Sequence, residues 1–211
     1  MKFKVCGMRD AENIKALAAL NPDFMGFIFY DKSPRFVGDM LDVELLQSLP
    51  KSIKKVGVFV NSSESYITQC IKKYGLDYAQ LHGKEMPDLC KNLRLKGISI
   101  IKAFSIDETF VFSMLNNYKP HVDFFLFDTK TKTGEEGGTG IKFDWNILKQ
   151  YDNEKPFLLA GGIDLDNIND LKQLDDMNIY AIDVNSKFET ASAMKDIEKI
   201  RQLVTLIKPK S

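Results

Sequence analysis

Short runs of β-branched and aromatic residues alternate along the chain with longer segments whose apolar residues recur every three or four positions. The first pattern predicts strands and the second predicts helices. Eight strands are predicted, at residues 3–6, 24–29, 55–60, 78–81, 99–104, 124–127, 157–160 and 180–184. Each is followed by a predicted helix. Asp10, Ser62 or Ser63, and Asp164 or Asp166 are expected to cap the first, third and seventh helices, because short polar side chains accept hydrogen bonds from helix-start amides.

The eight β–α units average about 26 residues over the 211 residues of the chain. Such alternation predicts a parallel sheet, either closed into a barrel or open and doubly wound. The apolar run FFLF ending at Phe127 is typical of parallel strands covered on both faces. Eight units with no element left over favour the barrel. We therefore predict an α/β fold, a single (β/α)8 TIM barrel formed by residues 1–211.

Composition narrows the possible partners. Lys plus Arg equals Asp plus Glu at 29 each, which argues against a polyanionic partner such as nucleic acid. No signal peptide and no apolar stretch near the roughly 18 residues of a membrane span are present. The three cysteines, Cys6, Cys70 and Cys90, are too widely spaced for a disulfide framework or a CxxC metal site. We expect a cytoplasmic protein without a membrane partner.

Two residues at predicted strand ends carry acid–base chemistry, because active sites in this fold gather at the carboxyl ends of the strands. Cys6 ends the first strand, where a thiolate can serve as a base or nucleophile; the alternative is an inert buried cysteine. Asp128 follows the apolar run 124–127, where desolvation lets a carboxyl group keep its proton and act as an acid. Across a barrel mouth, this pair is suited to isomerisation of a sugar phosphate.

Other strand ends offer anion-binding groups. Arg35, stiffened by Pro34, presents a planar fork to a carboxylate or phosphate, unless it is simply a solvated loop arginine. His82 ends the fourth strand as a ligand contact or as a structural histidine. Residues 129–140 hold four glycines, including Gly138 and Gly140, which is expected of a lid whose backbone amides are open to an anion. An ordinary flexible loop is the alternative.

The last two strands end in a candidate phosphate site. Gly161 and Gly162 follow the seventh strand and let the backbone approach a phosphate closely, while Asp183, Asn185 and Ser186 end the eighth. In barrels the loops after these two strands, with a short extra helix, frequently bind phosphate through backbone amides. Plain turns are the alternative.

Taken in order, these segments resemble the phosphoribosylanthranilate isomerase family over essentially the whole chain. The matching segments are KVCGM at 4–8, SPRFV at 33–37, VGVFVN at 56–61, QLHG at 80–83, FDT at 127–129, GGTGIKFDW at 137–145, LAGGI at 159–163 and DVNSKFE at 183–189. Their position at successive strand ends makes the resemblance specific.

The resemblance implies a barrel enzyme of tryptophan biosynthesis, monomeric or homodimeric, with no metal and no organic cofactor. Its phosphorylated small-molecule substrate would be N-(5-phosphoribosyl)anthranilate, converted by an Amadori rearrangement to 1-(2-carboxyphenylamino)-1-deoxyribulose 5-phosphate. Asp128 would protonate the ribose ring oxygen and Cys6 would take the C2′ proton. Arg35 would bind the anthranilate carboxylate. Backbone groups around Gly162, Asp183 and Asn185 would hold the phosphate, and residues 134–140 would close over the site.

Three departures from the family pattern stand out. Many relatives read DVSSGVE where this chain has Asn185 in place of a serine and Lys187 in place of a glycine. Arg9 follows the first motif where a small hydroxyl residue is usual, and it either contacts ligand or only covers the surface.

Three alternatives remain. A relative of indole-glycerol-phosphate synthase would need lysine acids at strand ends and an N-terminal extension. A sugar-phosphate epimerase would need metal-binding histidines, and the chain has only His82 and His121. A non-catalytic barrel that binds a phosphorylated ligand is the third.

Overall fold

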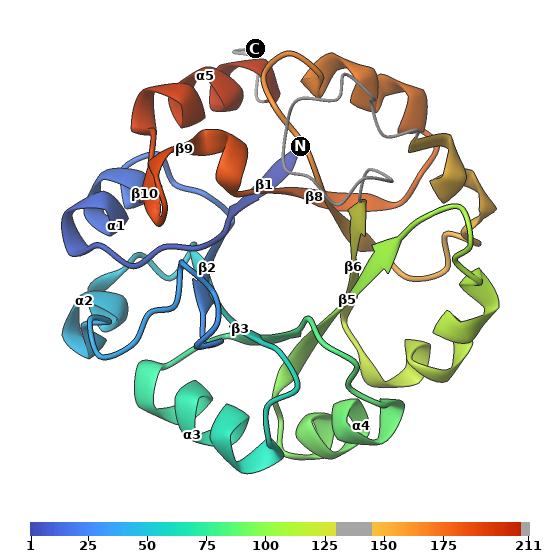
Figure 1. Cartoon of the computed structure of the whole chain (residues 1–211), viewed down its shortest axis with the longest axis horizontal. Helices are drawn as coiled ribbons and strands as arrows, with labels where there is room; N and C mark the ends of the chain where they lie inside the picture. Colours follow the sequence, from blue (N-terminus) through green and yellow to red (C-terminus); the bar gives the residue numbers. More distant parts are fainter. Residues whose placement is uncertain (130–144, 208–211) are drawn as a thin grey trace.

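The computed structural model describes residues 1–129 and 145–207, in which eight parallel strands form a closed barrel (Figure 1). The strands are β1 (Lys2–Val5), β2 (Phe24–Ile28), β3 (Lys54–Phe59), β4 (Tyr78–Leu81), β5 (Ser99–Ile106), β6 (Phe124–Thr129), β7 (Phe157–Ala160) and β8 (Ile179–Val184). Each strand pairs with the next, and β8 returns to β1 with Asp183 opposite Lys4. The prediction of a closed barrel is confirmed, and every predicted strand boundary lies within two residues of the observed one.

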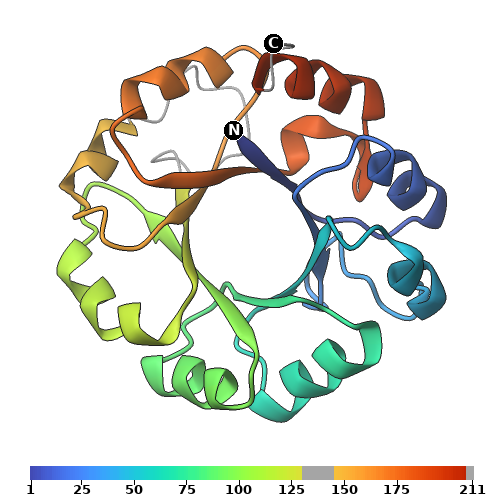
Figure 2. The same ribbon diagram turned by 180° about the vertical axis from the view of Figure 1, so that it is seen from behind.

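Helices surround the barrel on its outside, as Figures 1 and 2 show from its two ends. The α-helices are α1 (Ala11–Ala18), α2 (Val43–Ser48), α3 (Glu64–Tyr74), α4 (Pro87–Leu95) and α5 (Ile197–Ile207). The 3₁₀ helices are η1 (Phe112–Asn117), η2 (Lys119–His121), η3 (Trp145–Gln150), η4 (Ile168–Leu174) and η5 (Ser186–Phe188). Within the described ranges, no helix is long and apolar enough to cross a membrane.

Three of the eight predicted helices, those after β5, β6 and β7, are 3₁₀ helices. In η4 the buried residues Ile168, Leu171 and Leu174 recur every three positions, which is the period of a 3₁₀ helix. Over six or seven residues, apolar spacing of three or four does not separate the two helix types.

Capping explains where several helices begin. Asp10 accepts a hydrogen bond from the Asn13 amide at the start of α1, and Ser63 accepts one from Tyr66 at the start of α3. Both predicted caps are confirmed. The third prediction is wrong, because Asn167 precedes η4 without a side-chain cap, and the Asp164 carboxylate accepts from the adjacent Leu165 amide instead.

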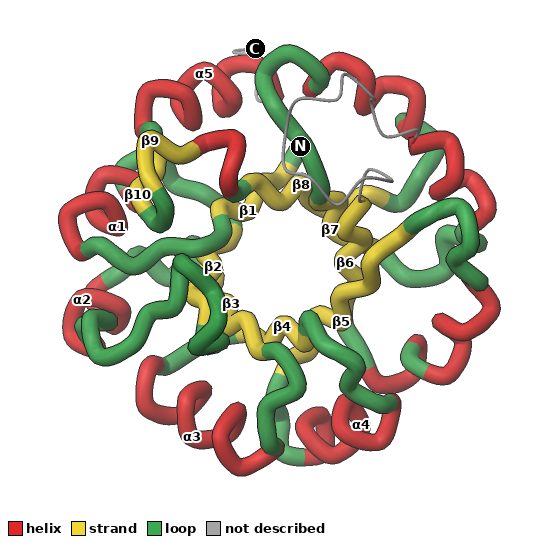
Figure 3. The backbone as a smooth tube through the Cα atoms, in the orientation of Figure 1, coloured by secondary structure: helices red, strands yellow, loops and turns green. Residues whose placement is uncertain are grey.

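Apolar residues form two layers of core. The larger cluster, which includes Phe3, Val5 and Phe27, lies between the strands and the helices. Residues at alternate positions of the same strands, such as Phe24, Val56 and Leu126, form a second cluster inside the barrel. Burial on both faces explains why the strands read as continuous apolar runs. Figure 3 shows the resulting inner ring of strands and outer ring of helices.

A small hairpin follows β8 and was not predicted. Strands β9 (Glu189–Ala191) and β10 (Met194–Lys195) pair antiparallel beside α1 and α5 (Figure 1). The expectation that no element is left over is therefore wrong. Strands of three and two residues are too short for period-two alternation to stand out. The hairpin matters because it carries Glu189 and Lys195 to the barrel mouth.

Candidate active site at the barrel mouth

Cys6 lies at the carboxyl end of β1, buried against the neighbouring strand. Its amide donates to the Val184 carbonyl of β8 at 2.9 Å. On the other side lies Gly26 of β2, where an added Cβ atom would come within 2.8 Å of the Cys6 sulfur. The absence of a side chain at Gly26 therefore makes room for the thiol.

Lys4 lies two residues before Cys6 on the same face of β1, inside the barrel. Its Nζ donates to Asp183 Oδ2 on the adjacent strand β8 at 2.7 Å. Lys4 is fully buried, Asp183 is 8% exposed, and the charge of the Lys4 ammonium acts on the Cys6 thiol. Asp183 Oδ1 is buried and accepts no hydrogen bond within the described residues. The structure thus joins a lysine that sequence reasoning missed to two predicted site residues.

Burial and charge act against each other at these groups. Burial raises the pKa of the Cys6 thiol, and Asp183 adds to this, whereas Lys4 and Lys195 lower it; the net pKa lies above its ordinary value. Burial likewise raises the pKa of Asp183 above its ordinary value despite the nearby Lys4 ammonium. Burial lowers the pKa of Lys4, but Asp183 and Cys6 outweigh it and raise the net pKa.

Asp128, on β6, lies beside His82 at the end of β4. His82 Nε2 is 3.4 Å from Asp128 Oδ2, and Gln80 Nε2 is 3.1 Å from His82 Nδ1. The two ring nitrogens of His82 thus face different partners, Nδ1 the Gln80 amide and Nε2 the Asp128 carboxylate. The charges of both His82 and Asp128 act on Asp183. Cys6, Asp183, His82 and Asp128, all predicted, therefore converge at one barrel mouth.

A buried ion pair holds the loop that carries His82. Lys102 Nζ lies 2.9 Å from Glu85 Oε2, and both side chains are 1% exposed. The same ammonium donates to the carbonyls of Leu81 at 3.1 Å and Gly83 at 2.8 Å, on either side of His82. The main chain around the imidazole is thereby fixed to β5.

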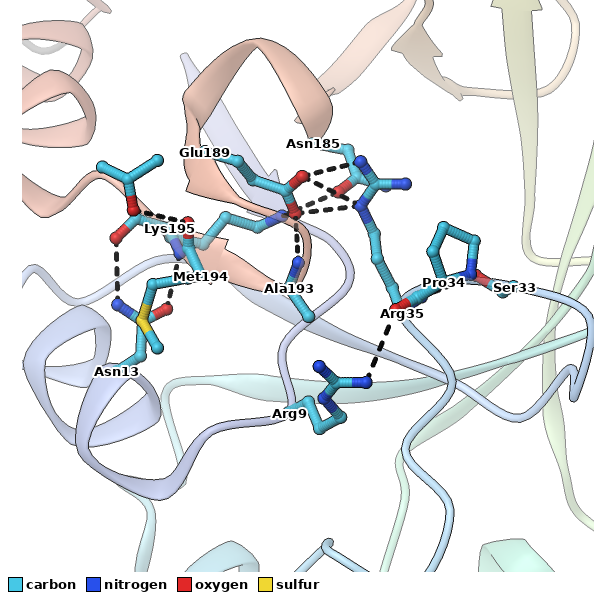
Figure 4. Close-up of polar contacts among 11 residues, drawn as sticks. Arg9, Asn13, Ser33, Pro34, Arg35, Asn185, Glu189, Ala193, Met194 and Lys195 are labelled. Carbon is cyan, nitrogen blue, oxygen red and sulfur yellow. Dashed lines mark hydrogen bonds and ion pairs between the residues drawn. The ribbon is translucent and has the colours of Figure 1, made fainter.

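Arg35 belongs to a second polar cluster, shown in Figure 4. Its Nη2 lies 2.6 Å from Glu189 Oε2, and its Nε donates to both carboxylate oxygens at 2.9 and 3.0 Å. Lys195 reaches the same carboxylate from β10 and donates to Asn185 Oδ1 at 2.7 Å. Arg9 donates to the carbonyls on both sides of Arg35, at 3.4 Å, so it contacts the loop that carries the guanidinium.

Two cations share one carboxylate in this cluster. Burial raises the pKa of Glu189, but Arg35 and Lys195 outweigh it, so the net pKa lies below its ordinary value. Burial lowers the pKa of Lys195, Arg35 lowers it further, and the net pKa is below its ordinary value. The cluster of Arg35, Glu189 and Lys195 therefore offers positive potential to an anionic ligand.

Gly7 joins the two clusters. Its φ of +80° lies in the left-handed region, and an added Cβ would come within 2.7 Å of Arg35 Cδ and 2.9 Å of Asn185 Oδ1. Only a glycine allows the chain leaving Cys6 to turn beneath Arg35.

The predicted phosphate-binding residues occupy the rim where β7 and β8 end side by side. Gly161 and Gly162 have φ values of +93° and +66°, and a side chain added at Gly162 would point into open space. Asn185 and Ser186 lie at the start of η5. Lys4 binds one carboxylate oxygen of Asp183, and Lys195 binds the side-chain oxygen of Asn185. Gly138 and Gly140, with the predicted lid, lie outside the described residues.

Sequence reasoning missed the buried charged partners of the site. These are Lys4, Glu85, Lys102, Glu189 and Lys195. A signal exists for two of them, because Lys4 and Lys102 interrupt otherwise apolar strands, and a charge buried in a strand requires a partner. Across the described ranges, no three His, Cys, Asp or Glu side chains gather as metal ligands would.

The arrangement can move protons on a small anionic ligand. A thiol on β1 and a carboxyl group on β6 face the barrel mouth with two strands, β7 and β8, between them. Arg35 and Lys195 provide cations on one side, and the glycine-rich rim after β7 provides main-chain amides. A ligand that carries a carboxylate and a phosphate can therefore place its middle atoms between Cys6 and Asp128.

Comparisons with known proteins agree on one family. The family model described as N-(5′-phosphoribosyl)anthranilate (PRA) isomerase matches residues 3–206. The N-(5′-phosphoribosyl)anthranilate isomerase of Parabacteroides distasonis is 42% identical over 208 residues, 98% of this chain and 93% of the relative. That of Phocaeicola vulgatus is 39% identical over 210 residues, 100% of this chain and 99% of the relative.

Solved structures are similar over the same length. The crystal structure of phosphoribosyl anthranilate isomerase from Thermotoga maritima superposes with a TM-score of 0.87 at 29% identity and covers 100% of both chains. Another isomerase of this name was solved in complex with reduced 1-(o-carboxyphenylamino)-1-deoxyribulose 5-phosphate. It superposes with a TM-score of 0.80 at 27% identity and covers 97% of both chains.

Proposed function

Since this chain belongs to the N-(5′-phosphoribosyl)anthranilate isomerase family of tryptophan biosynthesis, we propose that Cys6 and Asp128 are the general base and general acid of its isomerisation. The observation that carries this assignment is their convergence, with Asp183 and His82 between them, at the carboxyl end of the barrel. In this assignment residues 1–211 act as one barrel domain.

Asp128 opens the sugar ring. In its protonated form it gives its proton to the ribose ring oxygen, the bond between that oxygen and C1′ breaks, and a Schiff base forms. His82, whose Nε2 faces Asp128 at 3.4 Å, orients the carboxyl group and contacts the same end of the substrate. The resulting carboxylate is partnered by the His82 N–H.

Cys6 completes the rearrangement. Its thiolate removes the proton from C2′ of the Schiff base, which gives an enolamine that tautomerises to the ketone. Burial strengthens each electrostatic contact to the thiolate, because little water screens it. Lys4 and Lys195 supply the cations that favour the anionic sulfur.

Arg35 binds the anthranilate carboxylate. Its planar guanidinium matches a carboxylate, and Glu189 fixes its orientation before substrate arrives. Lys195 adds a second positive charge to this end of the site. The phosphate at the other end is held by main-chain amides of Gly161, Gly162, Asn185 and Ser186.

The direct test is the decay of phosphoribosylanthranilate fluorescence with purified protein. We expect acceleration well above the spontaneous background. A rate equal to background would instead support a non-catalytic barrel that binds a phosphorylated ligand. Light scattering of the same preparation distinguishes a monomer from a homodimer.

A further inference from the structure

Lys4 is a buried charge that neither gives nor takes a proton in the proposed acid–base steps. It is fully buried inside the barrel, where removing an ammonium from water carries a large penalty unless the charge is paired. Its ammonium donates to the carboxylate of Asp183 at 2.7 Å, and Lys4 lies two residues before Cys6 on the same face of β1. The chain therefore keeps a cation whose burial costs free energy directly beside the thiol that must lose a proton.

The backbone fixes this arrangement. Lys4 and Asp183 are register partners in the β1–β8 ladder, and Lys4 and Cys6 lie on the same face of β1. Lys4 Nζ is 2.7 Å from Asp183 Oδ2, while Asp183 Oδ1 lacks a hydrogen-bond partner within the described residues. The Lys4 ammonium thus lies beside both Asp183 and Cys6, and one oxygen of Asp183 has no hydrogen-bond partner within the described residues.

We propose that Lys4 is a positioning residue of the isomerisation, the shared counter-ion of Cys6 and Asp183, so that the charge on Asp183 controls how readily Cys6 becomes a thiolate. In a medium of low dielectric constant one ammonium offsets one anion well and two poorly. A thiolate at Cys6 is therefore favoured when Asp183 is neutral or held by a ligand donor, and disfavoured when both acids are charged.

The other charges around this triad act in defined directions. Cys6 faces Lys4 from β1, Asp183 from β8 and Lys195 from β10. Asp183 also faces His82 from β4, which favours its carboxylate, and Asp128 from β6, which opposes it. A substrate hydroxyl or amine that donates to the unpartnered Oδ1 would draw Asp183 away from Lys4 and leave the ammonium to the thiolate.

The test measures the reactivity of Cys6 directly. This inference rests on the proposed function, but alkylation of Cys6 by iodoacetamide, followed peptide by peptide across pH, needs no turnover. An opposite charge within contact distance is worth a factor of roughly ten or more in the thiolate population. We expect Lys4→Met to slow alkylation at neutral pH about tenfold or more, and Asp183→Asn to accelerate it. If Lys4 and Asp183 had a purely structural role, the alkylation rate of Cys6 would change in the same direction in both variants, and that result would overturn the proposal.

Two further variants keep the test decisive if Lys4→Met or Asp183→Asn fails to fold. Lys4→Arg keeps the charge and should alkylate within about threefold of the wild type. The double variant Lys4→Met with Asp183→Asn removes both charges, so no unpaired ion remains buried; it should react faster than Lys4→Met alone. Equal rates for the single and double variants would overturn the proposal.

Cys70, buried in α3 away from the barrel mouth, is the control for unfolding in the same samples. Its alkylation rate should stay at the wild-type value in every variant that remains folded. If Cys6→Ala retains full turnover while the order of alkylation rates holds, the proposed base is wrong and the counter-ion role stands. If the expected order of alkylation rates is not observed while Cys6→Ala is inactive, Cys6 stands as the base and the counter-ion role of Lys4 is wrong.

Discussion

The guanidinium of Arg35 is held by the carboxylate of Glu189: Nη2 lies 2.6 Å from Oε2, and Nε donates hydrogen bonds to both carboxylate oxygens. The two residues are 154 positions apart in the sequence and meet because β9 returns to the mouth beside the loop after β2 (Figure 4). An arginine held in this way is ordered before any ligand arrives, so less side-chain entropy is lost on binding.

Replacing Arg35 should impair recognition of the substrate. We expect Arg35→Met to raise KM about tenfold to a hundredfold, because a hydrogen bond to a charged group is worth about 1.5–3 kcal/mol, while kcat changes less. Steady-state kinetics measure both constants. Arg94→Met is the matched control, because Arg94 pairs with Asp123 at the opposite end of the barrel. An unchanged KM in Arg35→Met would remove this residue from the site.

Replacing either of the residues proposed to transfer protons should lower kcat. Acid–base groups contribute about 10²- to 10⁴-fold in rate, so Cys6→Ala and Asp128→Asn should each lose kcat by that order while substrate binding persists. Fluorescence decay under saturating substrate measures the loss. Cys70→Ala, at a buried helical cysteine outside the mouth, should keep wild-type kcat. Near-native turnover in either variant would contradict the role assigned to that residue.

Alanine substitutions at Gly7 and Gly97 distinguish the effect of backbone strain from the effect of a changed site geometry. Their φ values are +80° and +77°, so Gly7→Ala and Gly97→Ala incur a similar strain of about 1–2 kcal/mol. Only at Gly7 would the new Cβ strike Arg35 and Asn185, since nothing lies within 4 Å of it at Gly97. We expect both variants to lose stability in denaturant unfolding, and only Gly7→Ala to raise KM. The same KM in both would show that Arg35 does not depend on Gly7.

Glu189 should stabilise the fold above acidic pH. Its pKa lies below the ordinary value of 4.5 in the folded protein, so its stabilisation is complete above pH 4.5 and is lost as pH falls through the folded pKa. Glu189→Gln leaves Lys195 buried without a counter-ion and should lower the free energy of unfolding by about 3 kcal/mol at neutral pH.

The difference between wild type and Glu189→Gln should shrink toward acidic pH. Urea titrations at several pH values measure it. In the matched variant Glu198→Gln, loss of the exposed ion pair with Arg201 should cost at most about 0.5 kcal/mol. A difference that grows as pH falls would contradict the assignment.

Local sequence patterns were sufficient to locate the strands. Each strand of the barrel is buried on two faces, so an apolar run such as 124–127 is readable without knowledge of its neighbours. The position of Cys6, His82 and Asp128 at the barrel mouth was also predictable, because parallel strands of a barrel end at the same rim. The hairpin β9–β10 was not predictable, because its strands have three and two residues and no repeating pattern.

The sequence by itself determined the eight β–α units, the family and the residues at the strand ends, because these depend on local order along the chain. Only the tertiary structure decided which charges share the mouth. Lys4 meets Asp183 across 179 positions, and Arg35 meets Glu189 across 154. The first pair forms because barrel closure places β8 beside β1, and the second because β9 returns to the loop after β2. Ionic contacts act through space and leave no periodicity in the sequence.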